Sequence, residues 1–270
     1  MNPRIIHSEG QSIQYLCSGK ASQVTHVLLH GIGSGMHSWS HQLELVKNAS
    51  HFQVLAWNAP GYGASTKLTM AEPKAEDYAQ RVWQWLDFMD VKTPVTLVGH
   101  SLGCLMAASA TRLNAARVKR LILLSPARGY GASSRDIREK KLKDRLANLI
   151  EHGPQGMAKL RAHAMLSPHA PEAMRLRVQE IMSQVDPKGY TQAAHMLSNA
   201  DLCWELTHPK PACPVSVASG HLDSITTPED CQVVANAISQ TLLDLGPVGH
   251  ACAIESPQAV SQLLGLDAKQ

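Results

Sequence analysis

The chain alternates short apolar runs with longer segments of helical periodicity. Runs such as VLL and VLAW are typical of buried β-strands, whereas apolar residues three and four positions apart are typical of helices. Tyr78, Val82, Leu86 and Met89, for example, share one face of a predicted helix. The pattern predicts strands at Arg4–His7, Ile13–Cys17, Thr25–Leu29, Gln53–Trp57, Val95–Val98, Val118–Leu124, Pro214–Ala218 and Leu242–Leu245.

Helical segments lie between most of these strands. Short apolar strands that alternate with helices indicate an α/β fold, in which a mostly parallel sheet is covered by helices on both faces. Ser256 is a plausible N-cap for the last helix because Pro257 follows it at the first helical position. The predicted helices are His37–Val46, Ala75–Met89, Leu102–Leu113, Pro228–Ser239 and Ser256–Leu266.

One long segment, residues 127–205, interrupts the alternation. It contains no convincing strand, and its apolar residues, such as Leu142, Leu146 and Leu149, have helical spacing. Breaks at GPQG, SPHAP and DPKG divide it into several helices. We therefore predict a core made of residues 1–126 and 206–270, with a helical cap of residues 127–205 inserted between two strands.

The net charge does not call for a polyanionic partner. The 270 residues include 25 Lys and Arg and 22 Asp and Glu, which gives a formal charge of +3. We expect no nucleic-acid or membrane partner from this balance. The densest basic stretch is Arg135–Arg145, which Asp136, Glu139 and Asp144 interrupt. It favours a solvated helix face, and the alternative is a role in steering an anionic substrate towards a nearby site.

The cysteine pattern and the N-terminal segment predict a cytoplasmic protein. The six cysteines form no CxxC pair and have no zinc-site spacing, so we expect free thiols. The segment MNPRIIHSEG lacks the apolar centre of a signal peptide. No apolar run approaches the length of a membrane-spanning helix. The sequence does not fix an oligomeric state.

A candidate nucleophile lies at the end of the strand Val95–Val98. The segment Gly99-His100-Ser101-Leu102-Gly103 fits the pattern G-x-S-x-G and leads into an Ala-rich helix. Glycines two residues on either side let strand and helix pack closely around a strained turn that exposes the hydroxyl. The helix N-terminus adds a positive field where an oxyanion would form. Ser101 is therefore the predicted nucleophile.

A serine hydroxyl needs a base to remove its proton, and the base needs an acid to orient it. In this kind of site the acid and then the histidine follow the serine along the chain. Asp223 comes soon after the strand Pro214–Ala218, and His250 follows the last strand in a Gly-rich turn. Both should lie at the strand ends near Ser101, so we predict Asp223 and His250 as acid and base.

The other histidines have less suitable positions. His100 precedes the nucleophile, so its side chain should point away from the hydroxyl, and His30 is expected to brace the following turn by hydrogen bonds. His221, close to Asp223, is expected to serve the loop structure. His163 and His195 lie in the insertion, where a polar helical position is favoured over a place in the pocket.

Acyl transfer also requires donors for the developing oxyanion, and backbone amides provide them without side-chain entropy. The amide of Leu102, directly after the nucleophile, is one predicted donor. The second should come from the Gly-rich loop His30-Gly31-Ile32-Gly33. We predict the Ile32 amide, with the Gly33 amide as the alternative.

These motifs resemble the α/β-hydrolase superfamily across essentially the whole chain. The matching segments are HGIGSG, NAPGYGAS, GHSLG, GHLDSITTP and GHACAIESP, in the expected order. The resemblance implies an α/β-hydrolase fold with a mostly parallel, eight-stranded sheet flanked by helices. It also implies a helical cap inserted after the sixth strand, here residues 127–205, and no metal or organic cofactor.

Within the superfamily, the chain is most similar to bacterial carboxylesterases and β-ketoadipate enol-lactone hydrolases. Haloalkane dehalogenases and epoxide hydrolases carry aspartate where Ser101 stands. C–C bond hydrolases of aromatic ring-fission products are near neighbours, but they tend to follow the catalytic histidine with tryptophan, whereas Ala251 follows His250 here. Asn58 is a second departure, because the family often has aspartate there.

The predicted function is a serine hydrolase that cleaves a small carboxylic ester or lactone through an acyl-enzyme. C–C bond hydrolysis by the same triad is the enzymatic alternative, and ligand binding without turnover is the non-enzymatic one. Arg128 is expected either to pair with a substrate carboxylate or to form a surface salt bridge. The residues predicted to contact the substrate are Ser125, Arg128, Tyr190, Met196 and Met106.

Overall fold

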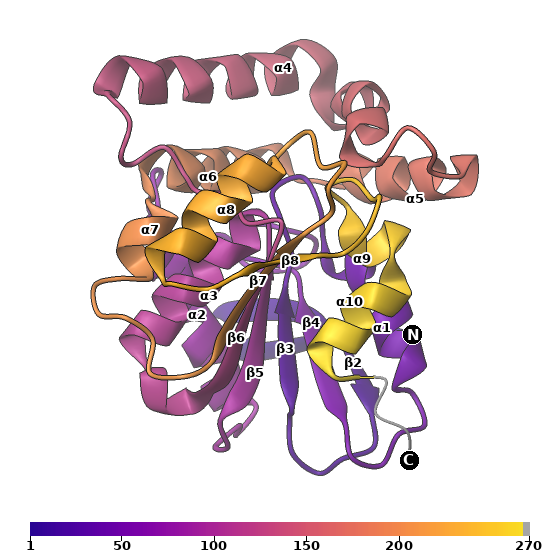
Figure 1. Cartoon of the computed structure of the whole chain (residues 1–270). Helices are drawn as coiled ribbons and strands as arrows, with labels where there is room; N and C mark the ends of the chain where they lie inside the picture. The colour runs from indigo at the N-terminus through magenta and orange to yellow at the C-terminus, as the bar shows by residue number, and fades with distance from the viewer. Residues whose placement is uncertain (267–270) are drawn as a thin grey trace.

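The computed structural model describes residues 1–266 and is built around one eight-stranded sheet (Figure 1). The strand order is β1-β2-β4-β3-β5-β6-β7-β8. Strand β2 is antiparallel to both of its neighbours, and all other pairs are parallel. The strands are β1 (Arg4–Ser8), β2 (Gln11–Gly19), β3 (His26–Leu29), β4 (Gln53–Trp57), β5 (Val95–His100), β6 (Val118–Leu124), β7 (Val215–Ser219) and β8 (Leu242–Asp244).

The eight predicted strands are all confirmed, with small differences at their ends. Strands β3 and β5 are buried at every position, as expected for central parallel strands that helices cover on both faces. Strand β2 extends beyond the predicted Ile13–Cys17 because it pairs with β1 along its first half and with β4 along its second. Strand β5 continues to His100, directly before the predicted nucleophile.

Helices cover both faces of the sheet, and each face has its own hydrophobic cluster between the strands and the helices. Helices α2, α3 and α8 pack on one face, and α1, α9 and α10 pack on the other (Figure 1). The short helix α9 directly before Ser256 is absent from the predicted elements. The bounds are α1 (Ser40–Leu45), α2 (Ala75–Phe88), α3 (Leu102–Leu113), α8 (Pro228–Ala237), α9 (Cys252–Glu255) and α10 (Pro257–Leu264), with 3-10 turns η1 (Met36–Trp39) and η2 (Ala115–Arg117).

The remaining helices all come from the chain between β6 and β7, within the span assigned to the cap. Gly153, in the predicted break GPQG, has φ 61° and ψ 179° and kinks α4. The break DPKG begins α6, where the Asp186 side chain accepts a hydrogen bond from the Gly189 amide at 2.8 Å. These elements are α4 (Arg135–Arg161), η3 (Ala162–Met165), α5 (Glu172–Ser183), α6 (Pro187–Asn199) and α7 (Leu202–Glu205).

Helix α6 holds these inserted helices against the core. A Cβ atom at Gly189 would lie 1.9 Å from the carbonyl oxygen of Gly61, so the two backbones touch without an intervening side chain. The Gln192 side-chain amide donates hydrogen bonds to the carbonyls of Leu68 at 2.8 Å and Met70 at 2.7 Å. These contacts fix the insertion over the strand ends, so the space between it and the sheet has a defined shape.

Two further predictions concern the whole chain. All six cysteines are free, as expected from their spacing. No helix within residues 1–266 combines the length and the apolar character needed to cross a membrane.

Buried histidines make the stability of this fold depend on pH. His26, on β3, has its Nε2 3.0 Å from the carbonyl of Leu264 on α10, and burial lowers the pKa of this histidine to about 4. Burial also lowers the pKa of His30 to about 4 and that of His100 to about 3. Unfolding returns these groups to an ordinary pKa of about 6.5, so the unfolded chain binds more protons between these values.

We therefore expect the free energy of unfolding to decrease as pH falls from about 6.5 towards 4, by about 1 kcal/mol per pH unit for each such histidine. Thermal unfolding between pH 7.5 and 4.5, followed by circular dichroism, measures this slope. The His26→Gln variant cannot bind that proton and should show a shallower decrease in Tm. An unchanged slope in the variant would contradict the assignment.

Candidate active site

Ser101 lies in a strained turn between β5 and α3. Its backbone has φ 53° and ψ −117°, a left-handed conformation that is costly for a residue with a Cβ atom. The Ser101 amide donates to the Leu124 carbonyl on β6 at 2.9 Å, and the Ser101 carbonyl accepts from the amides of Cys104 and Ala127. These bonds hold the turn in place, so the serine is presented at the carboxyl end of β5.

The two glycines of the motif allow this turn because no side chain fits there. A Cβ atom at Gly99 would lie 2.5 Å from the Gly103 carbonyl oxygen. A Cβ atom at Gly103 would lie 2.3 Å from the Leu29 carbonyl oxygen on β3. Helix α3 therefore approaches β3 and β5 at backbone distance, which supports the reason given for the G-x-S-x-G pattern.

The His250 ring is oriented by Asp223. His250 Nδ1 lies 2.9 Å from Asp223 Oδ2 and 3.1 Å from the Thr226 hydroxyl, and both side chains of the His250–Asp223 pair are buried. A carboxylate accepts hydrogen bonds, so Nδ1 carries the proton and Nε2 has a free lone pair. The ring is thus held in the tautomer in which Nε2 can act as a base.

Asp223 is stabilised as a carboxylate. The amides of Ile225 and Thr226 donate to Asp223 Oδ1 at 2.8 and 3.0 Å. Burial alone would raise the pKa of Asp223, but the neighbouring His250 and these amides together lower it to about 2. Asp223 is therefore ionised at neutral pH, and its charge can balance a proton on His250.

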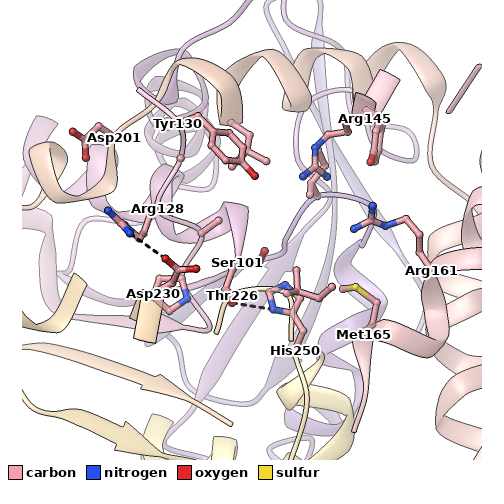
Figure 2. Close-up of a pocket in the computed structure, with 18 of the residues that line it drawn as sticks. Ser101, Arg128, Tyr130, Arg145, Arg161, Met165, Asp201, Thr226, Asp230 and His250 are labelled. Carbon is pink, nitrogen blue, oxygen red and sulfur yellow. Dashed lines mark hydrogen bonds and ion pairs between the residues drawn. The ribbon is translucent and has the colours of Figure 1, made fainter. Parts of the chain in front are cut away.

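Ser101 and His250 line one cavity of about 280 Å³, which lies between the strand ends and the inserted helices (Figure 2). Within the described part of the chain, Ser101 Oγ makes no hydrogen bond to the His250 ring. Such bonds often tighten only when a substrate is present. Among residues 1–266, no three His, Cys, Asp or Glu side chains are grouped so that they could hold a metal ion.

A second, smaller cavity of about 30 Å³ adjoins the same serine. It shares Ser101, His250 and Ile32 with the larger cavity, and its other walls are mostly apolar. Val178 and Ile181 of α5 and Ile254 of α9 form part of these walls. The serine therefore lies between a larger polar space and a small apolar one.

The predicted oxyanion donors lie next to the serine. The Ile32 amide and the Leu102 amide donate no hydrogen bond to any group of the described residues. Ile32 and Gly33 line both cavities, and Leu102 is the first residue of α3, where the helix dipole is positive. Backbone donors with no partner beside a nucleophile are suited to stabilising an oxyanion.

Two other histidines support the site without facing solvent. His30 Nδ1 donates to the Gly31 carbonyl at 2.8 Å, and His30 Nε2 accepts from the Ala59 amide at 3.0 Å, which confirms the predicted brace of this turn. His100 Nε2 donates to the carbonyl of His250 at 2.7 Å. Burial and the nearby His250 lower the pKa of His100, which keeps it neutral. His100 thus holds the backbone of His250, a role that the sequence did not suggest.

The loop that carries His250 is also tied to the insertion through Glu255. The Glu255 carboxylate accepts hydrogen bonds from the amides of Gly249 at 2.8 Å and Ser167 at 3.0 Å, and from the Ser167 hydroxyl. The Ala251 amide donates to the Met165 carbonyl of η3 at 2.7 Å. The backbone on both sides of His250 is therefore fixed to the inserted helices.

The predicted contact residues fall into two groups. Arg128 and Tyr190 line the larger cavity, and Arg128 also pairs with Asp230 at 3.0 Å, in line with the predicted salt bridge. Met106, Met196 and Ser125 are fully buried and do not line either of the two cavities beside Ser101. The two methionines pack in the hydrophobic core, and the Ser125 carbonyl accepts from the Thr226 hydroxyl at 3.0 Å.

The three remaining histidines considered in the sequence, His163, His195 and His221, do not line the cavity with Ser101. His221 pairs with Asp244 at 3.0 Å on the surface, as a loop residue would. His163 lies 2.9 Å from Arg175, and His195 lies 3.8 Å from Glu72. None of these three rings lines the cavity.

Sequence reasoning missed several residues of the cavity wall. Tyr130, Arg145, Arg161 and Met165 come from the insertion, and Thr226 comes from the loop after β7 (Figure 2). The single signal for any of them is the basic stretch Arg135–Arg145, which ends at one of the cavity arginines. The composition of a helix does not tell which of its polar faces lines a cavity when the neighbouring elements are not known.

Comparisons with known proteins agree with this architecture. A curated relative, the (E)-2-((N-methylformamido)methylene)succinate hydrolase of Acinetobacter baylyi, is 23% identical over 258 residues, or 95% of this chain and 94% of the relative. A thermophilic esterase from Thermogutta terrifontis, solved with malate bound, has a TM-score of 0.82 at 20% identity over 98% of this chain and 97% of its own. The enol-lactonase from Burkholderia xenovorans also has a TM-score of 0.82 at 20% identity, over 98% of this chain and 100% of its own.

The profile that describes the alpha/beta hydrolase family matches residues 27–263, which include the parallel strands from β3 to β8 and the inserted helices but not β1 and β2. The sheet order and the strained serine turn are consistent with that match. The resemblance drawn from the sequence motifs is thereby confirmed, and the chain belongs to the alpha/beta hydrolase family.

Proposed function

We propose that this protein is a cytoplasmic serine hydrolase that cleaves a small carboxylic ester or lactone through an acyl-enzyme. The observation that carries the proposal is that a serine and an oriented histidine line the same cavity. Ser101 is presented on a strained turn, and His250 is held by Asp223 with Nε2 left as the basic nitrogen. This arrangement matches the roles of nucleophile, base and orienting acid.

The proposed reaction has two steps. Ser101 Oγ attacks the acyl carbon while His250 Nε2 takes its proton, and the charge of Asp223 stabilises the resulting imidazolium. The amides of Ile32 and Leu102 stabilise the oxyanion, and the proton passes from His250 to the departing oxygen. A water molecule, deprotonated by His250, then attacks the acyl-enzyme and releases the acid and Ser101.

The similar proteins support an ester or lactone substrate. The Thermogutta protein is an esterase and the Burkholderia protein is an enol-lactonase. The Acinetobacter relative is named for the hydrolysis of a substituted succinate, and the Thermogutta structure contains malate. Small acidic compounds therefore belong among the substrates to be tried alongside neutral esters.

Removal of the nucleophile is the first test. We expect Ser101→Ala to lower kcat for p-nitrophenyl acetate by up to about 10⁶-fold, because a triad without its nucleophile loses covalent catalysis. Initial rates with the acetate, butyrate and octanoate esters measure this loss. Acetate should be preferred over octanoate, because the cavities beside Ser101 have volumes of about 280 and 30 Å³.

A matched control is Ser109→Ala on the same helix. The Ser109 side chain is buried and lines neither of the two cavities beside Ser101, so this variant should retain wild-type rates. Equal slow rates in wild type and Ser101→Ala would reject ester hydrolysis by Ser101. In that case, enol lactones and ring-fission dienones, the substrates of C–C hydrolases, would be assayed next.

Asp223 provides a separate test of how the base is held. Asp223→Asn is expected to lower kcat by about 10⁴-fold, because an amide removes the negative charge and favours the wrong histidine tautomer. The pKa of Asp223 is lowered to about 2, so its ionisation adds no step to the wild-type profile above pH 4. Initial rates of both proteins, each measured at its own optimum between pH 5 and 9, give the loss in kcat. A variant kcat within about tenfold of wild type would contradict the orienting role of Asp223.

A further inference from the structure

Two arginines from the insertion point into the cavity that contains Ser101. Arg145 lies in the first part of α4, and Arg161 is the last residue of that helix. The kink at Gly153 separates the two parts of α4, so residues far apart along it face the same space. Figure 2 shows both guanidinium groups on the side of the cavity opposite Arg128, above Ser101 and His250.

These two arginines lack the kind of carboxylate partner that Arg128, the other arginine lining the cavity, has. Arg128 pairs with Asp230 at 3.0 Å, and Arg112, under α7, pairs with Glu205 at 2.7 Å. Within residues 1–266, neither Arg145 nor Arg161 forms a side-chain hydrogen bond or a salt bridge. Both are partly buried, so each guanidinium has given up part of its hydration without a compensating charge.

The two positive charges act on each other. Burial lowers the pKa of Arg161, and the positive charge of Arg145 lowers it further. Two acidic residues line the same cavity, Asp201 and Asp230, but both lie on the Arg128 side (Figure 2). The Arg145–Arg161 side of the cavity is therefore a concentration of positive charge that an anionic group would neutralise.

A carboxylate fits this position in chemistry and in size. Guanidinium groups bind carboxylates through charge-assisted and often bidentate hydrogen bonds. The cavity of about 280 Å³ has room for a small organic acid, with its reacting carbonyl at Ser101. The small apolar space on the other side of Ser101 would take a group about the size of a methyl.

We infer that Arg145 and Arg161 are specificity-determining residues, which bind a carboxylate that the substrate carries away from its scissile bond. This inference rests on the proposed function, because it places the carboxylate relative to the bond that Ser101 attacks. The substrate class is then a small acidic ester or lactone with a compact apolar group on one side of the reacting carbonyl.

The test compares two esters that differ in one charge. Monomethyl succinate and dimethyl succinate share the same methyl ester, and only the first has a free carboxylate. We expect wild type to have the higher kcat/KM for monomethyl succinate. Arg145→Gln and Arg161→Gln should each lower the ratio of the two kcat/KM values roughly tenfold to hundredfold, mainly through KM, because each removes a hydrogen bond to a charged group. Arg161→Lys should recover part of the loss.

Arg135→Gln is the matched control. Arg135 lies on the same helix, and its exposed side chain pairs with Glu139 at 2.6 Å rather than lining the cavity. This variant should keep the wild-type ratio. All assays need one ionic strength, because salt screens charge interactions. Equal kcat/KM values for the two esters in wild type, or the same ratio in all variants, would overturn the inference.

A binding measurement with a ligand that cannot be hydrolysed tests the carboxylate site separately from the proposed function. Isothermal titration of wild type with succinate should show binding that Arg161→Gln weakens by a similar factor, and inorganic phosphate should bind more weakly. If neither ester is hydrolysed but succinate binds in this way, the serine-hydrolase proposal fails and the carboxylate site stands. Absence of succinate binding, or tighter binding of phosphate, would overturn the carboxylate site even if Ser101-dependent ester hydrolysis is found.

Discussion

The strained turn at Ser101 determines how the rest of the structure is arranged around the site. A non-glycine residue at φ 53° persists only when its surroundings hold it. The Ser101 amide is bound by β6, and the glycines at 99 and 103 let α3 touch β3 and β5 without side chains between them. Close packing of one helix against three strands thus stabilises a turn that would be unfavourable in isolation. Part of the favourable packing of α3 on the sheet therefore offsets the backbone strain at Ser101.

His250 is also held by several contacts from different parts of the chain. His250 is fixed by its ring through Asp223 and by its carbonyl through His100. Glu255 and the bond from Ala251 to η3 tie the surrounding loop to the inserted helices. Any change in the position of η3 would therefore reach His250 through one hydrogen bond. The inserted helices that form one wall of the cavity beside Ser101 therefore also hold the backbone on both sides of His250.

The sheet and the candidate residues Ser101, Asp223 and His250 could be predicted from the sequence because both depend on local rules. Strands have short apolar runs, and the serine turn requires glycines at fixed positions, so each leaves a pattern that a single sequence can show. Asp223 and His250 follow their strands directly, and parallel strands place their carboxyl ends at one edge. The role of His100 was not predictable in this way. Its partner is the carbonyl of a residue 150 positions away, and a carbonyl is present at every residue.

The cavity wall could not be predicted for a related physical reason. A helix that crosses above a cavity has polar residues on its solvent face and on its cavity face, so its hydrophobic pattern does not tell the two apart. Arg135 and Arg145 belong to one basic stretch, but the first pairs with Glu139 on the surface and the second faces Ser101 from across the cavity. The kink at Gly153 then brings Arg161 to the same wall. What distinguishes these arginines is the presence or absence of a neighbouring carboxylate, and that depends on how the whole insertion folds over the sheet.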